Sequence, residues 1–97
     1  MAEIILSPLA AYDLEQILDW SVGQFGGSVA FAYMADIEAA ITLLGEYPEA
    51  GEVISVIRPP VRAYPCRRHR IIYDLNADEV LIVRVLHVSQ SVQLVLN

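Results

Sequence analysis

EVLIVRVLH, residues 79–87, predicts the centre of a β-sheet because it is apolar on both sides of an extended chain. Its alternating positions carry Leu81, Val83 and Val85 on one side, and Val80, Ile82 and Leu86 on the other. A strand of this kind lies in the middle of a sheet, with both faces mostly covered. Only Arg84 interrupts the pattern, and a charge there is costly unless it is paired or reaches a rim. A cross-strand pair with Asp74 is one explanation.

Two more strands are predicted before this one. HRIIYDL (69–75) and VRAYP (61–65) are rich in β-branched and aromatic residues. NADE (76–79) has the composition of a turn, so the last two strands form a hairpin. The tail after residue 88, SQSVQLVLN (89–97), fits either a short helix or an extended arm.

The first half of the chain predicts a short strand and two helices. EIIL (3–6) is the strand, and Ser7 followed by Pro8 is an N-cap with proline at the first helical position. A helix is expected from about Pro8 to Phe25, ended by GGS (26–28), which supplies Ser28 as the next N-cap. The second helix, about Val29 to Glu46, is stopped by YPEAG (47–51).

The short break between these helices favours an antiparallel helical hairpin. The sequence therefore predicts one α+β domain spanning residues 1–97. In it, an N-terminal strand and a helical hairpin pack on a small antiparallel sheet, in the order β-α-α-β-β-β.

Composition narrows the class of protein. A hydrophobic content of 56% with 19% charged residues is typical of a folded globular chain. No segment reaches the ~18 apolar residues that a membrane span needs, so a transmembrane protein is not expected, and the acidic N-terminus does not resemble a signal peptide. Cys66 is the only cysteine, so no internal disulfide forms, as suits a reducing cytoplasm.

The charges divide sharply along the chain. Residues 1–57 hold nine acids and no base, whereas residues 58–97 hold six arginines and three acids, for a formal net charge of −6. Five of the arginines fall between Arg58 and Arg70. The acidic total argues against a general or sequence-specific nucleic-acid binder, whereas the local basic patch would suit an acidic partner or a phosphate.

Few residues point to catalysis. The chain has no P-loop, nucleophile-elbow or zincin motif, and His69, His87 and Cys66 match no common zinc spacing, so neither a metal nor a cofactor is expected. In one continuous strand Cys66 and His69 would point to opposite faces, which disfavours a nucleophilic pair.

The arginines allow two interpretations. In the first, Arg62, Arg70 and Arg84 share a sheet face and form a pocket for phosphate or carboxylate. In the second, the cluster consists of solvated residues that keep a sheet edge from aggregating. A separate set of apolar residues exceeds what one small core needs, which suggests a partner interface or a homodimer. It comprises Trp20, Tyr33, Val92, Leu94, Val95 and Leu96.

Several stretches together resemble the ParE toxins of the ParE/RelE toxin–antitoxin superfamily. They are LSPLAAYDLEQILDW (6–20), FGGSVAFAYMADIEAAITLLGEYPEAGE (25–52), RPPVRAYPCRRHRIIYDL (58–75) and VLIVRVLH (80–87). The sharpest motifs are L-S-x-x-A-x-x-D-L-x-x-I from Leu6 to Ile17, P-x-x-G from Pro48 to Gly51, and R-V-L-H from Arg84 to His87. The family fold is also a helical hairpin on an antiparallel sheet, in agreement with the pattern above.

The resemblance implies a cytoplasmic, non-enzymatic toxin that poisons DNA gyrase and is held inactive, in a hetero-oligomer, by a ParD-type antitoxin. The basic sheet would receive an acidic antitoxin tail, and the C-terminal segment would face the target. The residues expected to bind target or antitoxin are Arg62, Arg67, Arg70, Arg84 and His87.

Two alternatives remain beside this one. In the RelE-like branch, which cuts mRNA in the ribosomal A site, one basic catalytic position matches Arg70. The others fall near Val61, Ala63, Val88 or Ser89, and Leu94, so most are empty. A nuclease needs several positioned cations and an acid–base pair, which disfavours this reading. The third possibility is a homologue that binds antitoxin but is no longer toxic.

Overall fold

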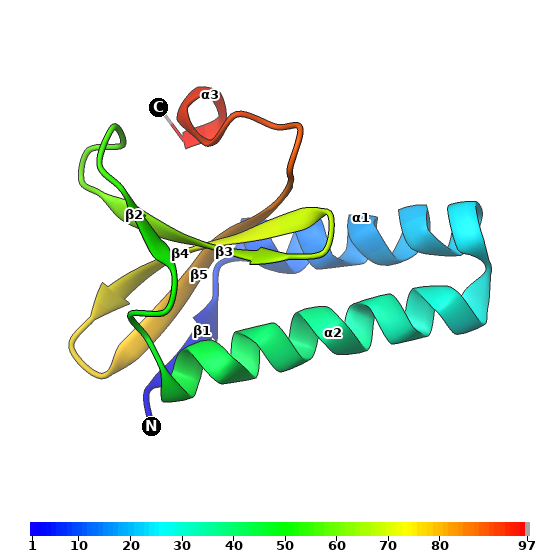
Figure 1. Ribbon diagram of the computed structural model, residues 1–97, viewed down its shortest axis with the longest axis horizontal. Helices are drawn as coiled ribbons and strands as arrows, with labels where there is room; N and C mark the ends of the chain where they lie inside the picture. Colours follow the sequence, from blue (N-terminus) through cyan, green and yellow to red (C-terminus); the bar gives the residue numbers. More distant parts are fainter. Residues whose placement is uncertain (97) are drawn as a thin grey trace.

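The computed structural model describes residues 1–96 and has the predicted α+β architecture. In chain order, the helices and strands are β1 (Glu3–Leu6), α1 (Pro8–Phe25), α2 (Gly27–Glu46), β2 (Glu52–Ile54), β3 (Val61–Cys66), β4 (His69–Asn76), β5 (Glu79–His87) and α3 (Val92–Leu96). The helical hairpin of α1 and α2 extends well beyond the sheet on which it packs (Figure 1). The fold class predicted from the sequence is therefore confirmed.

The sheet has five strands in the order β1-β5-β4-β3-β2, so β5 has a neighbour on each side, as its two apolar faces predict. Three of the four strand pairs are antiparallel, as expected, but β1 pairs with β5 in parallel. The connection is long enough for a parallel pair, because two helices and three strands lie between β1 and β5 in the chain. Strand β2 was missed because its three residues carry too little pattern.

The helix starts differ in their chemistry. The Ser7 hydroxyl accepts a hydrogen bond from the Ala10 N–H at 3.0 Å and Pro8 begins α1, which confirms the predicted cap. The predicted N-cap at Ser28 is wrong, because α2 already begins at Gly27 and has no side-chain cap. Gly26 has φ of 82° and ψ of 169°, an extended positive-φ conformation that essentially only glycine adopts, and the chain turns there between the helices.

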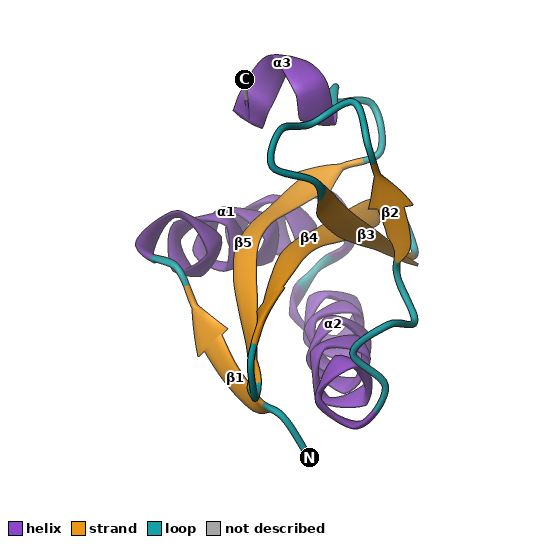
Figure 2. Ribbon diagram, turned by 90° about the vertical axis from the view of Figure 1, so that its left-hand side faces the viewer, coloured by secondary structure: helices purple, strands orange, loops and turns teal. Residues whose placement is uncertain are grey.

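Each face of the sheet has its own hydrophobic core. The larger lies against α1 and α2 and includes Ile71 and Tyr73 of β4, whereas Ile72, between them, belongs to the smaller core under α3. Figure 2 shows the helical hairpin and α3 at different ends of the sheet. The C-terminal segment is thus a short helix rather than an extended arm, and its Val92 is buried.

The apolar excess is not where the sequence suggested. Tyr33 and Val92 are core residues, so their assignment to an external interface is wrong, whereas Leu94 is 83% exposed. Exposed apolar side chains line the helical hairpin instead, and they include Leu18, Val22, Phe25, Val29 and Phe31.

Helix α2 has the length and hydropathy expected of a membrane span, so the expectation that no segment is long and apolar enough is wrong. Its Tyr33, Ile37 and Leu44 pack in the core beneath the sheet. The core helix of a folded domain satisfies the same criteria.

Candidate functional site: a hollow between α1 and the end of β5

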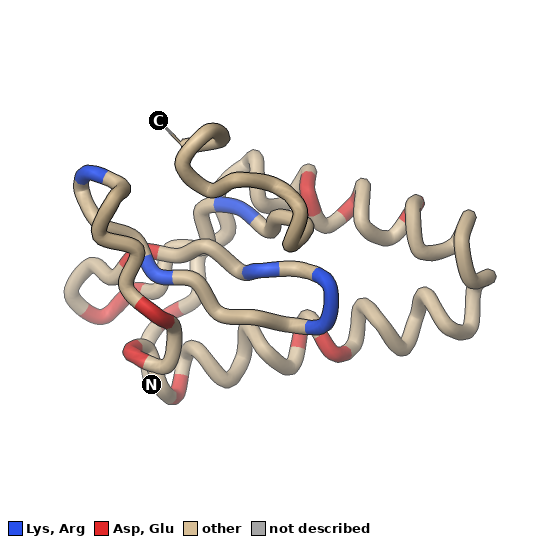
Figure 3. Tube along the Cα trace, turned by 45° about the horizontal axis from the view of Figure 1, so that its top comes forward, with Lys and Arg blue, Asp and Glu red and all other residues tan. Residues whose placement is uncertain are grey.

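The arginines do not form one pocket on the sheet. They are distributed along the strands and loops of the sheet, whereas most acids lie on the helices and the β4–β5 turn (Figure 3). Arg62 lies opposite Tyr73 and Arg84 lies opposite Ile72. Since Ile72 and Tyr73 are adjacent in β4, Arg62 and Arg84 lie on opposite faces. The predicted face shared by all three arginines is therefore wrong for Arg62, whereas Arg70, two residues before Ile72, lies on the same face as Arg84.

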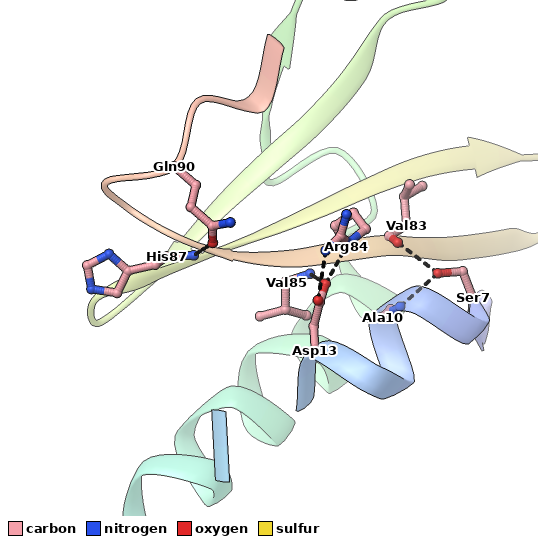
Figure 4. Close-up of polar contacts among 8 residues, drawn as sticks. All are labelled: Ser7, Ala10, Asp13, Val83, Arg84, Val85, His87 and Gln90. Carbon is pink, nitrogen blue, oxygen red and sulfur yellow. Dashed lines mark hydrogen bonds and ion pairs between the residues drawn. The ribbon is translucent and has the colours of Figure 1, made fainter. Parts of the chain in front are cut away.

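Arg84 pairs with Asp13 of α1 rather than with Asp74 (Figure 4). Its Nε donates to one carboxylate oxygen at 2.8 Å and its Nη2 donates to the other at 2.9 Å. This hydrogen bonding raises the pKa of the Arg84 guanidinium. The irregularity between Ile72 and Tyr73 shifts the register, so Asp74 lies opposite Leu81 and its carboxylate accepts the N–H of Leu75.

The other predicted arginines also have partners within the chain. Arg62 donates to the carbonyl of Gly51 at 2.8 Å, and Arg70 donates to the carbonyl of Gln90 at 2.6 Å. Arg67, on the β3–β4 turn, forms an exposed ion pair with Asp36 of α2. These contacts fasten loops and helices to the sheet.

A cluster of aromatic rings lies where α1, α2 and the ends of β4 and β5 meet. The His69 ring is edge-to-face with Tyr33, Trp20 and His87, with centroids 5.6, 5.8 and 5.3 Å away. Burial, together with the nearby His87, lowers the pKa of His69 to about 4. His69 therefore stays neutral at physiological pH.

Cys66 lies directly across the β3–β4 hairpin from His69. The expectation that the two side chains point to opposite faces is wrong, because Arg67 and Arg68 form a turn between them. Burial raises the pKa of the Cys66 thiol, which opposes thiolate formation. The pair therefore lacks an activated nucleophile.

This cluster forms one wall of a hollow of about 390 Å³. Its lining residues are Asp13, Gln16, Ile17, Trp20, His69, Val85, His87 and Gln90. Of the five residues expected to bind target or antitoxin, only His87 lines it. The signal for the α1 wall was present in the sequence, because positions 13, 16, 17 and 20 follow the spacing of one helix face.

Nothing in the described part of the chain, residues 1–96, gathers three metal-ligating side chains. The hollow instead combines neutral hydrogen-bonding groups, an ion pair and apolar walls. Such a site recognises a ligand by shape and hydrogen bonding.

Comparison with known proteins defines the class. The family model described as "ParE toxin of type II toxin-antitoxin system, parDE" matches residues 4–92. The chain is 30% identical to "Toxin ParE1" of Mycobacterium tuberculosis over 91% of each protein. It is 28% identical to "Toxin ParE3" of Caulobacter vibrioides over 89% of this chain and 86% of the relative.

The fold also matches a solved structure, "Chromosomal ParDE TA system from P. aeruginosa". The TM-score is 0.78, with 22% identity, over 90% of this chain and 96% of the other. The matches define a toxin of a type II toxin–antitoxin system. The chain belongs to the ParE toxin family.

Proposed function

We propose that this chain is a cytoplasmic toxin that poisons DNA gyrase without catalysis of its own and is neutralised by a ParD-type antitoxin. Membership of the ParE toxin family supports the toxin role. The absence of catalysis is supported by one observation. Four arginines already form hydrogen bonds or ion pairs within the chain: Arg62, Arg67, Arg70 and Arg84.

An RNA-cleaving toxin would need those cations to converge on one phosphate. It must activate a 2′-OH and stabilise the charge that develops on phosphorus. Here Arg62 and Arg84 lie on opposite faces of the sheet, and Arg84 is held by Asp13. His69 is buried and hydrogen-bonded to Tyr33, which leaves His87 as the more accessible histidine.

The exposed apolar side chains support binding of an antitoxin. Phe31 is 78% exposed and Val29 and Phe25 about half exposed, all near the end of the helical hairpin that projects beyond the sheet. Several exposed large apolar side chains gathered at one end of a small domain are typical of a protein interface. A helix of the antitoxin would cover this surface, while its acidic tail would follow the arginines of the sheet.

The test is a supercoiling assay with purified gyrase and relaxed plasmid, with and without the chain freed of any partner. We expect less supercoiled product or accumulated cleaved DNA, reversed by adding the co-purified antitoxin. The Leu94→Asp variant tests the C-terminal segment as the target-facing element, because Leu94 is exposed and its replacement leaves the core intact. A Gln24→Asp variant, at an exposed position of the hairpin, is the matched control for added charge.

The alternatives give distinct outcomes. Normal gyrase activity in the presence of the folded chain, together with cleavage of mRNA on ribosomes, would contradict this proposal and support the RelE-like alternative. Inactivity in both assays with retained antitoxin binding would identify a homologue that is no longer toxic. Full toxicity of Leu94→Asp would move the target-facing surface away from α3.

A further inference from the structure

The two histidines of the hollow each present a ring N–H donor to it. The Nδ1 of His87 accepts the N–H of Ser89 at 3.1 Å, which leaves the ring proton of the neutral form on Nε2. The Tyr33 hydroxyl accepts the N–H of Arg68 at 3.2 Å and has its own proton available for the Nδ1 of His69, 2.6 Å away. We therefore assign the ring proton of His69 to Nε2 as well.

Within residues 1–96, neither Nε2 atom has a hydrogen-bond partner, although both rings line the hollow. Gln90 adds a third donor to the same wall. Its side-chain oxygen accepts the N–H of His87 at 2.9 Å, which leaves the amide NH₂ available (Figure 4). A ligand with an acceptor oxygen would satisfy these donors.

The charges of the hollow favour a neutral acceptor over an anion. Its one formally charged lining residue is Asp13, whose carboxylate is already held by Arg84 and by the Val85 N–H at 2.9 Å. A carboxylate or phosphate would be repelled by Asp13 and by a chain of net charge −6, with no free cation in the lining to offset this. A carbonyl oxygen accepts two N–H groups without that penalty.

The remaining walls suit an apolar group next to that oxygen. Trp20, Ile17 and Val85 contribute aromatic and aliphatic surface. A volume of about 390 Å³ lies within the range of small-ligand pockets, enough for one large side chain together with its peptide group.

We propose that this hollow binds the uncharged carbonyl or carboxamide of a peptide segment from a protein partner, with the neighbouring aromatic side chain packed on Trp20. The Nε2–H groups of His69 and His87 donate to the oxygen, and the Gln90 amide is a further donor beside it. This site is separate from the exposed apolar surface of the helical hairpin, and it stands whether or not the target is gyrase.

The experiment uses N-acetylphenylalaninamide as the neutral probe and N-acetylphenylalanine as its carboxylate counterpart. Both are titrated into the full chain, and the histidine ring nitrogens are followed by NMR, which also reports the tautomers directly. We expect saturable shifts at the Nε2 of both histidines, with a dissociation constant for the neutral probe on the order of 1–10 mM, as its size allows. The carboxylate should bind at least about tenfold more weakly.

Two variants complete the test. His87→Phe keeps a ring in the wall but removes one donor, and should weaken binding of the neutral probe at least about fivefold. Val56→Ala, at an exposed position outside the hollow, should leave binding unchanged. The proposal is overturned if the neutral probe causes no saturable shift, if the carboxylate binds as tightly, or if His87→Phe binds like the unmodified chain. These binding results do not depend on whether the chain inhibits gyrase.

Discussion

The carboxylate of Asp13 and the guanidinium of Arg84 join α1 to the edge of β5 at the point where β1 has ended. Strand β1 pairs with β5 only as far as Ile82. Beyond it, the Ser7 hydroxyl donates to the Val83 carbonyl at 2.7 Å, and Asp13 accepts the N–H of Val85 at 2.9 Å. The side chains of Ser7, the N-cap of α1, and Asp13 therefore form the hydrogen bonds with β5 that a longer β1 would have formed.

Asp13→Ala should destabilise the protein more than any exposed acid-to-alanine change on α1. The substitution leaves Arg84 without its partner, although only 19% of its side chain is exposed, and it leaves the Val85 N–H unsatisfied. We expect the free energy of unfolding to fall by about 3 kcal/mol, measured by urea denaturation.

Asp19→Ala is the matched control on the same helix, because Asp19 is exposed, and its effect should stay within about 0.5 kcal/mol. A cycle with Arg84→Met tests the pairing itself. Since each single change leaves one charge unpaired, the double variant should lose less stability than the sum of the singles. Additive losses would show that the ion pair contributes nothing.

Gly51→Ala should destabilise the fold because a Cβ there would lie 2.6 Å from the ring and hydroxyl of Tyr73. The Gly51 N–H also donates to the Tyr73 hydroxyl at 2.7 Å, and that hydroxyl donates to the Pro48 carbonyl. Since Tyr73 is fully buried, it has no room to move. We expect a loss of about 1–3 kcal/mol in the free energy of unfolding.

Gly23→Ala should stabilise the protein, in contrast to Gly51→Ala. Gly23 is in α1, and a Cβ there meets nothing within 4 Å. Alanine should therefore raise the free energy of unfolding by up to about 0.5–1 kcal/mol, because glycine is a poor helix former. Equal effects of the two substitutions would contradict the close approach of Gly51 to Tyr73.

His69 should make the protein less stable in mild acid. Its pKa falls from 6.5 to about 4 on folding, so the unfolded chain binds the proton more readily between these values. Stability is therefore complete above about pH 6.5 and falls as the pH is lowered towards 4. From the size of the shift, the loss approaches about 3 kcal/mol, measured as the unfolding free energy in urea at several pH values.

His69→Gln should flatten this pH dependence in the range where the histidine would titrate. The groups around the ring are Tyr33, His87 and Asp13, of which His87 opposes the charge and Asp13 favours it. His87→Gln is the control, because the half-buried His87 should leave most of the slope in place. An unchanged slope in His69→Gln would assign the acid sensitivity to other groups.

The local patterns were sufficient to predict most of the fold. The strands at 69–75 and 79–87 have strong β-forming residues, and Ser7-Pro8 has the chemistry of a helix start, so these needed no tertiary information. Strand β2 was not predictable, because its three residues gain their order from pairing with β3. Ser28 is not an N-cap, because the chain turns at Gly26 and α2 begins at Gly27.

The site was harder to predict, because it depends on register. The arginines were visible in the sequence, but whether two of them share a face depends on which residue of β4 each one opposes. One irregularity between Ile72 and Tyr73 puts Arg84 opposite Ile72 instead of Ile71, and so on the face away from Arg62. The hollow draws residues from α1, β4, β5 and the following loop, and only its helical wall follows a sequence period.

The C-terminal helix offers the sharpest contrast between neighbouring positions. Val92 is 5% exposed and packs with Ile57, Ile72 and Leu86, whereas Leu94 is 83% exposed. Val92→Ala removes buried methyl groups and should lower the free energy of unfolding by about 2 kcal/mol, while Leu94→Ala should change it by less than about 0.5 kcal/mol. Urea denaturation gives both values, and hydrogen exchange at the Ile72 and Leu86 amides reports whether α3 still covers them. Equal, small effects of the two substitutions would mean that α3 does not hold this core closed, and deletion of the tail could then be used as a test of toxicity without disturbing the fold.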